Sequence, residues 1–293
     1  MLTDEGSSRN RQTARILLAA VVCALFLLAL PTTVNAAAEN TVPMPDQHLE
    51  RELAAILAGR DGSFGVAVVN LGDGRTASIN ATSIFPAASM YKLLVMYCVF
   101  EAIDRGDLSP YDVVTIEDED VIQDEPDWGG FFPGDTPTVQ EALNAMVTVS
   151  SNAAGLALTR EVGGWGPIES AASKLGMKNT FAADDEFWST PADMALFFQL
   201  LARGYLINHQ ASIQMIDLLL RQSINDRLPA LLPYGAAVAH KTGELDDVRN
   251  DGGIVYGRAG WYVMVVMSEG GTPDDQVQVE AELSSLVYHR YGR

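Results

Sequence analysis

A serine and a lysine lie three positions apart at the entrance to the apolar segment 85–100, FPAASMYKLLVMYCVF. Residues with this spacing share one face of a helix, so Ser89 and Lys92 can lie side by side. A serine hydroxyl becomes an effective nucleophile when a base takes its proton, and a lysine can be that base when burial or nearby positive charge lowers its pKa. Backbone N–H groups of the helix start would face an oxyanion at Ser89. The spacing therefore predicts acyl transfer through a serine nucleophile.

The pair alone also fits a helix cap and a solvated lysine, because serine and lysine are common residues. Two observations favour the chemical interpretation. Lys92 lies within an apolar run, where an unpaired charge is costly. Two further motifs follow downstream, Ser150-Ser151-Asn152 and Lys241-Thr242-Gly243. The order of the three motifs carries the functional prediction.

With their flanking residues FPAAS, MVTVSSNAA and AHKTG, the three motifs resemble those of the penicillin-recognising serine enzymes. Within that group they are most similar to the class A β-lactamases and their β-lactamase-like relatives. The resemblance covers nearly the whole chain after its N-terminal segment, from about residue 49 to residue 291.

The resemblance implies a catalytic role for four residues. Ser89 would be the acylated nucleophile and Lys92 its base or proton relay. Ser150 would pass the proton to the leaving nitrogen, and Lys241 would supply positive charge near Ser150. Two lysines beside one serine lower each other's pKa, which favours a neutral base at neutral pH.

The resemblance also implies a set of substrate-binding residues. Asn152 would hold the side-chain amide of the substrate, and Thr242 would bind its carboxylate. Gly243, which has no side chain, would let the strand edge approach the substrate, while the N–H groups of Ser89 and Glu244 would form the oxyanion hole. Arg249 either reaches the same carboxylate or is a solvated turn arginine.

Two features depart from the class A pattern. Ser151 stands where those enzymes usually carry aspartate, which would loosen local support of the motif. The segment 176–189 lacks the ExxLN pattern that supplies their deacylating glutamate, and its only carboxylates are Asp184, Asp185 and Glu186. Any of these could position a water, or all could be solvated loop charges. A general base contributes about 10²–10⁴-fold, so deacylation without one is expected to be slow.

Three functions are therefore compared. The first is a serine hydrolase of the β-lactamase-like type that opens β-lactam amides through an acyl-Ser89 intermediate, as in antibiotic resistance. The second is a penicillin-binding D,D-peptidase-like or esterase-like enzyme that β-lactams acylate and that releases them slowly. The third is a non-catalytic module that senses cell-wall peptides or β-lactams, although a pure binder needs no proton relay.

Hydrophobic periodicity predicts an α+β fold in which both chain ends build an antiparallel sheet with flanking terminal helices, joined to an all-helical insert. The catalytic domain is expected at 46–293, with an α/β part at about 46–85 and 205–293 and a helical part at about 86–204. The site is expected between these two parts. The main elements expected are helices at 47–60, 139–149, 153–162, 168–175, 191–203, 209–221 and 274–291, and strands at 65–71, 75–80, 236–240, 253–256 and 261–267.

The N-terminal segment has the layout of a secretory signal peptide. Basic residues precede the apolar run 16–30, and small residues follow at 34–38. Residues 1–38 are expected to be the signal and 39–45 a flexible leader, which predicts a secreted or extracytoplasmic protein. Removal of the signal leaves Cys98 as the one cysteine, so no intrachain disulfide is expected, and its apolar surroundings indicate a core residue.

The composition of the chain limits which binding partners are expected. A formal net charge of −19 argues against nucleic acid and anionic membrane surfaces. The histidines show no metal-ligand spacing, so neither a metal nor a cofactor is expected; they are His48, His209, His240 and His289. The expected partner is a small β-lactam or a cell-wall peptide, with membrane contact only through an uncleaved signal segment, and a monomer is expected.

Overall fold

The computed structural model describes residues 44–121, 127–184 and 186–293. The expected signal peptide and most of the expected leader lie outside the described residues. Met44 and Pro45, at the end of that leader, form the short strand β1. Across the described ranges, no helix combines the length and apolarity needed to cross a membrane.

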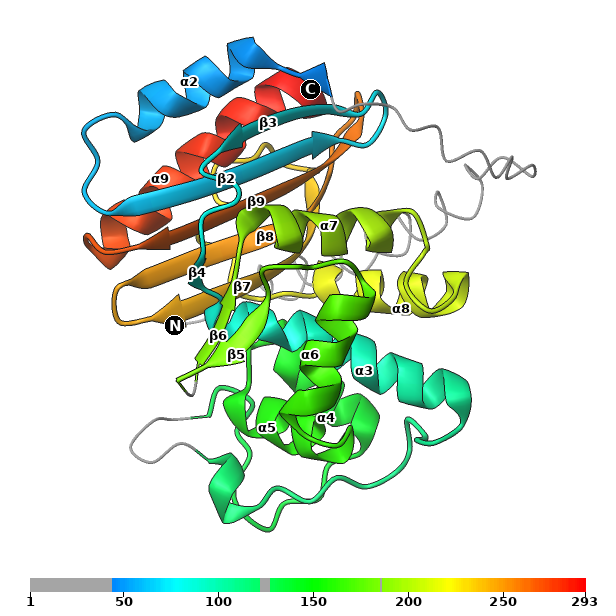
Figure 1. Ribbon diagram of the computed structural model, residues 1–293. Coiled ribbons are helices and arrows are strands. Elements are labelled where there is room, and N and C mark those ends of the chain that lie inside the picture. The colour runs from blue at the N-terminus through cyan, green and yellow to red at the C-terminus, as the bar shows by residue number, and fades with distance from the viewer. Residues whose placement is uncertain (1–43, 122–126, 185) are drawn as a thin grey trace, which may run out of the picture. The chain divides into compact units, whose positions relative to one another are not determined.

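A six-stranded sheet forms the frame, in the order β1-β3-β2-β9-β8-β7 (Figure 1). Neighbouring strands are antiparallel except β1 and β3, which are parallel. The strands are β1 (Met44–Pro45), β2 (Ser63–Asn70), β3 (Arg75–Ile79), β7 (Ala237–Leu245), β8 (Val248–Tyr256) and β9 (Trp261–Glu269). The predicted β2–β3 hairpin is confirmed, and β7 extends past residue 240 to include Lys241-Thr242-Gly243.

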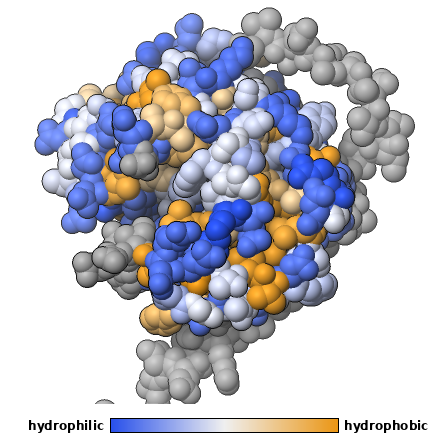
Figure 2. All heavy atoms as spheres, turned by 60° about the horizontal axis from the view of Figure 1, so that its bottom comes forward, coloured by the Kyte–Doolittle hydropathy of each residue, from blue (hydrophilic) through white to orange (hydrophobic). Residues whose placement is uncertain are grey.

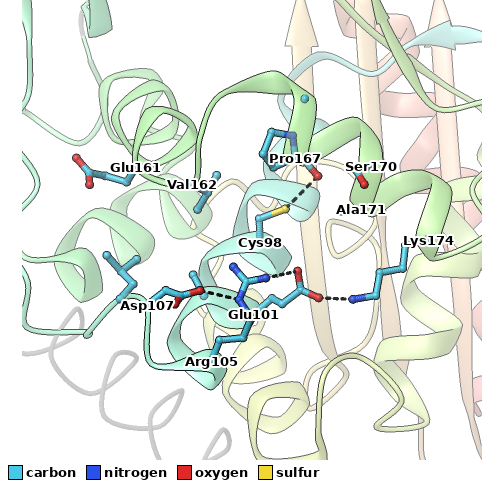
Figure 3. A pocket seen from close by; sticks show the side chains of 13 residues that line it. Cys98, Glu101, Arg105, Asp107, Glu161, Val162, Pro167, Ser170, Ala171 and Lys174 are labelled. Carbon is cyan, nitrogen blue, oxygen red and sulfur yellow. Dashed lines mark hydrogen bonds and ion pairs between the residues drawn. The ribbon is translucent and has the colours of Figure 1, made fainter.

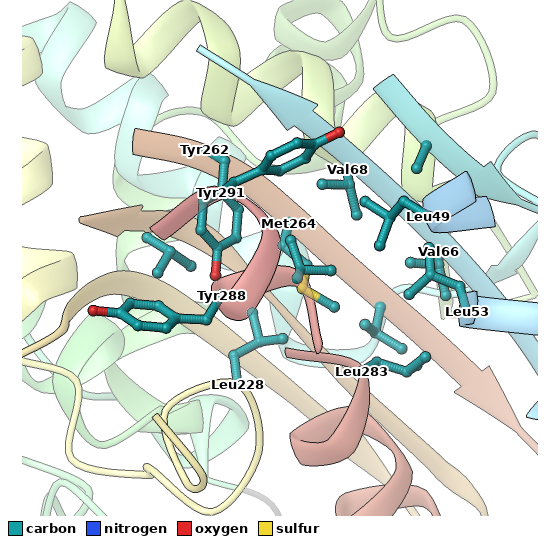
Figure 4. Packing of buried hydrophobic residues seen from close by; sticks show 14 of the residues in the cluster. Leu49, Leu53, Val66, Val68, Leu228, Tyr262, Met264, Leu283, Tyr288 and Tyr291 are labelled. Carbon is teal, nitrogen blue, oxygen red and sulfur yellow. The ribbon is translucent and has the colours of Figure 1, made fainter. Parts of the chain in front are cut away.

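Helices from the two ends of the described chain pack together against this sheet. α2 (Gln47–Leu57) contacts α9 (Pro273–Val287), and α9 contacts β8 and β9 (Figure 1). Their apolar side chains join those of β2 and β9 in one buried cluster (Figure 4). Its members include Leu49, Leu53, Val66, Val68, Tyr262, Met264 and Leu283. This packing confirms the predicted fold class of an antiparallel sheet with terminal helices.

α7 (Pro191–Ala202) covers the opposite face of the sheet. A Cβ on Gly65 of β2 would lie 2.7 Å from Pro191 Cγ. Gly65 alternates with the cluster residue Val66, so the two point to opposite faces. Residues 191–203 were expected in the helical part. In the structure α7 contacts β2, β8 and β9, because its buried apolar side chains meet the sheet. Its predicted start is confirmed, since Thr190 caps it and Pro191 opens the first turn.

The remaining helices surround α3, which is apolar almost all round and buried. Gly106, with φ of 78°, ends α3 in a left-handed turn. Thr138 and Glu141 form a capping box at the start of α4. These elements are η1 (Ala88–Tyr91), α3 (Lys92–Arg105), η2 (Asp118–Asp120), α4 (Val139–Thr148), α5 (Asn152–Glu161), α6 (Trp165–Lys174) and α8 (His209–Leu220).

A second, three-stranded sheet lies within the segment expected to be helices and loops. β4 (Phe85–Pro86) pairs with β6 (Glu186–Ser189), and β6 pairs with β5 (Phe181–Ala183). No strand was expected within 176–189, but part of this segment forms the β5–β6 hairpin. The pairing holds this hairpin directly against the residues that precede Ser89.

Asp46 connects the two ends of the described chain. Its carboxylate caps α2 by accepting from Leu49 N at 3.1 Å, and it accepts from Tyr291 Oη at 3.0 Å and from Arg290 at 3.1 Å. Burial alone would raise the pKa of Asp46, but these hydrogen bonds outweigh it and leave the pKa below its ordinary value.

We expect Asp46→Asn to lower the free energy of unfolding at pH 7 by about 1–3 kcal/mol, because it removes a buried charged acceptor. The folded-state pKa is the lower one, so the advantage of the wild type is complete above the ordinary carboxyl pKa and is lost as pH falls through the folded-state value. Urea unfolding of both proteins from pH 7 down to pH 3 checks this. Equal stability at pH 7 would contradict it.

Candidate active site

Ser89 lies in the short 3₁₀ turn η1, which leads directly into α3 at Lys92. The turn is held from outside, because Asn250 Nδ2 donates to Pro86 O at 2.9 Å and to Ala87 O at 3.2 Å. Ser89 is half-buried, whereas Lys92 is fully buried. The local sequence thus places the hydroxyl near the surface and the amine beneath it.

Lys92 points to the second motif. Its Nζ donates to Ser150 O at 2.7 Å and to Asn152 Oδ1 at 2.7 Å, and it lies 3.5 Å from Ser150 Oγ. Among the described residues, its hydrogen bonds therefore go to the second motif rather than to Ser89. Burial, and then the charge of Lys241, lower the pKa of Lys92 well below its ordinary value.

Lys241 reaches the same serine from the sheet. Its Nζ donates to Ser150 Oγ at 2.9 Å and to Thr242 O at 2.7 Å. Burial lowers the pKa of Lys241 to about 7. Ser150 Oγ therefore lies between two buried amines, and its backbone is in the left-handed region with φ of 61°. The structure brings three of the four predicted catalytic side chains into one line of contacts, with Ser89 one helical turn from Lys92.

Gly243 allows β7 to approach the turn that carries Ser89. A Cβ at this position would lie 2.8 Å from Ala87 O and 3.2 Å from Ala88 Cβ. The approach to the Ala87 oxygen is closer than a Cβ atom tolerates, so a side chain at this position would displace the backbone. The glycine of the third motif therefore allows β7 to pack closely against η1.

Two arginines lie near this end of β7. Arg249 donates to the backbone oxygens of Leu245 and Val248, so it braces its own hairpin. Arg227 is only 1% exposed, pairs with the Glu244 carboxylate, and donates to the Asn250 carbonyl oxygen at 3.2 Å. Sequence reasoning missed Arg227; the available signal was a charged residue beside the apolar run that follows it.

Two of the three proposed deacylating carboxylates, Asp184 and Glu186, lie at the tip of the β5–β6 hairpin. Asp184 is exposed in the turn, with φ of 53°, and Glu186 is exposed on β6. The next residue, Phe187, is buried, with its ring centroid 6.1 Å from that of Tyr91. Alternation along the strand places Glu186 on the face opposite Phe187 and therefore away from Tyr91. Asp185 lies outside the described residues.

A separate hollow of about 530 Å³ lies further along α3, against α6 (Figure 3). Four of the charged side chains that line it are paired, with Glu101 bonded to Lys174 and Arg105 Nε lying 2.7 Å from Asp107 Oδ2. Cys98 lines it and is 6% exposed, and burial raises the pKa of its thiol to about 12. The thiol is thus protonated at neutral pH, and the interpretation of Cys98 as a core residue is confirmed.

His240 lies on β7 next to Lys241 and is buried. His240 Nδ1 lies 2.9 Å from Asp251 Oδ1, and strand alternation places His240 on the side of β7 opposite Lys241.

Two aromatic side chains lie at the surface. Trp128 and Phe132 are 76% and 69% exposed, so neither covers a core. On the face turned forward in Figure 2, hydrophobic residues are interspersed with hydrophilic ones.

Within the described ranges, no cluster of three or more acidic, histidine or cysteine side chains is suited to hold a metal.

Comparison with known proteins assigns this arrangement to a class. The profile of the β-lactamase enzyme family matches residues 48–291. A β-lactamase of Bacteroides uniformis is 25% identical, over 90% of this chain and 98% of the relative. The β-lactamase VEB-1 of Pseudomonas aeruginosa is 27% identical, over 75% of this chain and 77% of the relative.

Solved structures share the fold. PBP-A superposes with a TM-score of 0.80 at 23% identity, covering 85% of this chain and 98% of that one. The TLA-1 extended-spectrum β-lactamase gives a TM-score of 0.78 at 22% identity, covering 84% and 99%. The fold is therefore that of the β-lactamases and transpeptidases, and the protein is a β-lactamase-like serine hydrolase. The chain belongs to the β-lactamase enzyme family.

The burial of the Lys241 amine should lower the free energy of unfolding of the protein. Its folded-state pKa of about 7 lies below the ordinary value of 10.5, so the cost of burying the charge is complete below pH 7. Between these two values the unfolded chain binds a proton that the folded chain lacks, so wild-type stability rises with pH. We expect Lys241→Met to raise the free energy of unfolding at pH 6 by at least about 1 kcal/mol, or about 2–4 °C in Tm.

Thermal unfolding of both proteins from pH 6 to pH 10 checks this, and the advantage of Lys241→Met should shrink steadily above pH 7. Lys174→Met is the matched control, because the ammonium of Lys174 is exposed and paired with Glu101. A Lys241→Met protein less stable than the wild type at pH 6 would refute the argument.

Proposed function

We propose that Ser89 attacks the amide of a β-lactam, or of a related cell-wall peptide, and forms an acyl-enzyme. The observation that supports this is the unbroken set of contacts from Lys92 through Ser150 to Lys241, one helical turn from Ser89. Such an arrangement matches a nucleophile with a nearby base and a second hydroxyl for proton transfer.

The acylation step follows from these contacts. Neutral Lys92 takes the proton from Ser89 Oγ as the oxygen bonds to the carbonyl carbon. The N–H groups of Ser89 and Glu244 would stabilise the resulting oxyanion. The proton then passes through Ser150 to the leaving nitrogen as the C–N bond breaks, and Lys241 keeps the Ser150 hydroxyl oriented. Asn152 and Thr242 would hold the amide and carboxylate of the substrate.

We propose further that deacylation is slow. In the described part of the chain, no hydrogen bond or ion pair links Asp184 or Glu186 to the motif residues, and strand alternation turns Glu186 away from Tyr91. Water would then attack the acyl-enzyme without a placed general base.

Two finer functions share the acylation step. The placement of Asp184 and Glu186 favours a penicillin-binding, D,D-peptidase-like or esterase-like enzyme with a long-lived adduct. The names of the curated relatives favour a β-lactamase that turns over, in the class A manner. The geometry supports the first more strongly. We also propose that the protein works outside the cytoplasm, because the N-terminal segment has the layout of a signal peptide. We propose separately that it is a monomer.

The first measurement is rapid mixing of the chain, prepared without residues 1–38, with nitrocefin, alongside intact mass. We expect one equivalent of product in a burst and a persistent mass adduct, both absent in Ser89→Ala. Sustained turnover after the burst would contradict slow deacylation and indicate a β-lactamase. A wild-type protein that shows neither burst nor adduct would refute acylation by β-lactams and favour a non-catalytic binding module.

The exposed carboxylates provide a second test. We expect Asp184→Asn and Glu186→Gln, alone or together, to leave the decay of the acyl-enzyme within about twofold of the wild type, because neither side chain faces the motifs; loss of a true general base would slow it by about 10²–10⁴-fold. Decay of the mass adduct over hours measures this. A large slowing in either variant would identify that residue as the base.

A further inference from the structure

The carboxylate of Asp127 holds the second motif from a neighbouring loop. It accepts from Ser151 Oγ at 2.8 Å, from Asn152 N at 2.9 Å and from Ala153 N at 3.2 Å. Ser151 is fully buried, so its hydroxyl has no access to water in place of this partner. The Asp127 side chain thus binds the first two N–H groups of α5 and also the hydroxyl of Ser151, the middle residue of the motif.

These contacts complete the hydrogen bonding of the first turn of α5. The first N–H groups of a helix have no partner within it and need an outside acceptor. Ser151 Oγ accepts from Ala154 N at 3.0 Å, while Asp127 takes the N–H groups of Asn152 and Ala153. A carboxylate at this end also interacts favourably with the helix dipole.

Gly129 shows that the loop is built for this approach. A Cβ at Gly129 would lie 2.8 Å from Asp127 Oδ2 and 2.8 Å from both Cβ and Oγ of Ser151. Any side chain there would push the loop from the helix start. Ser151 was expected to loosen the motif because it stands where the class A enzymes usually carry aspartate. Here Asp127 supplies a carboxylate to that serine.

The contact bears directly on the proton relay. Ser150 precedes Ser151 and has a left-handed backbone, which needs surrounding structure to maintain it. Lys92 donates to Ser150 O and to Asn152 Oδ1, and these two residues flank Ser151, whose hydroxyl Asp127 binds. A shift of this segment would therefore move both partners of the Lys92 amine.

We propose that Asp127 is a positioning residue for acylation, which holds the second motif so that Ser150 and Asn152 meet Lys92. The proposal rests on the proposed function for its kinetic consequence, but not for its structural one. Asp127 also lies close enough to Lys92 for its charge to raise the pKa of that amine, against the effect of burial. Its replacement should thus disturb both geometry and charge at the relay.

A carboxylate swap tests the proposal. Asp127→Ala should reduce the rate of Ser89 acylation by a fluorescent penicillin by about 10–100-fold, the scale of a misplacement near 1 Å. Ser151→Asp should also reduce it, because it places a second carboxylate beside the first. The double variant Asp127→Ser/Ser151→Asp returns a single carboxylate to the network and should recover most of the wild-type rate. Asp135→Ala is the control, since Asp135 caps Phe132 N at 2.8 Å on the same loop.

Hydrogen exchange gives a readout that does not depend on activity. In Asp127→Ala the amides of Asn152 and Ala153 should exchange faster, while Asp135→Ala should leave them unchanged. Three results would each overturn the proposal. Asp127→Ala could be acylated at the wild-type rate, or the amides of Asn152 and Ala153 could exchange at an unchanged rate. The double variant could also be as slow as the product of both single effects. A wild-type protein that is not acylated, with exchange altered as expected, would instead refute the proposed function alone.

Discussion

The burial of two lysines side by side is the constraint on which the rest of this site depends. Lys92 and Lys241 have no exposed surface, and their Nζ atoms lie 3.5 and 2.9 Å from the same Ser150 Oγ. Their hydrogen-bond partners are neutral oxygen atoms, so little compensates for the loss of hydration. Each amine is therefore more stable without its proton than a lysine in water. The burial that destabilises the fold is what makes an amine able to accept a proton from serine.

Close approaches between elements from distant parts of the chain maintain this arrangement. A Cβ at Gly155 of α5 would lie 2.9 Å from Lys92 Cε, and one at Gly243 of β7 would lie 2.8 Å from Ala87 O. Both glycines are needed because another side chain would occupy the space of a buried amine or of the turn before Ser89. Ser150, in a left-handed conformation, is held between these elements. The site thus depends on backbone geometry that only the assembled fold provides.

Amphipathic periodicity within short windows predicted the fold class. The motif residues that meet at Ser150 were predicted from three short motifs and their order along the chain. Other contacts left no such trace. Asp127 binds Ser151 across 24 positions and Arg227 binds Glu244 across 17, and a lone charged residue does not reveal its partner. The strands β5 and β6 are too short for an alternating pattern to be recognised. The sequence did not reveal that α7 contacts the sheet, because an apolar helix can pack against helices or a sheet.

Acylation and deacylation, as proposed, would rest on different parts of the chain. The groups proposed for acylation come from three motifs that α3, α5 and β7 hold together, whereas a deacylating base would have to come from the short β5–β6 hairpin. On β6 the inward position belongs to Phe187, whose ring packs on Tyr91, and the ring of Tyr91 lies 5.9 Å from Lys92 Nζ. Glu186 occupies the adjacent, outward position. A shift of one residue in the register of this strand would exchange the two side chains. The pairing of β6 with β4 opposes such a shift, so a three-stranded sheet keeps an aromatic ring, rather than a carboxylate, facing the relay.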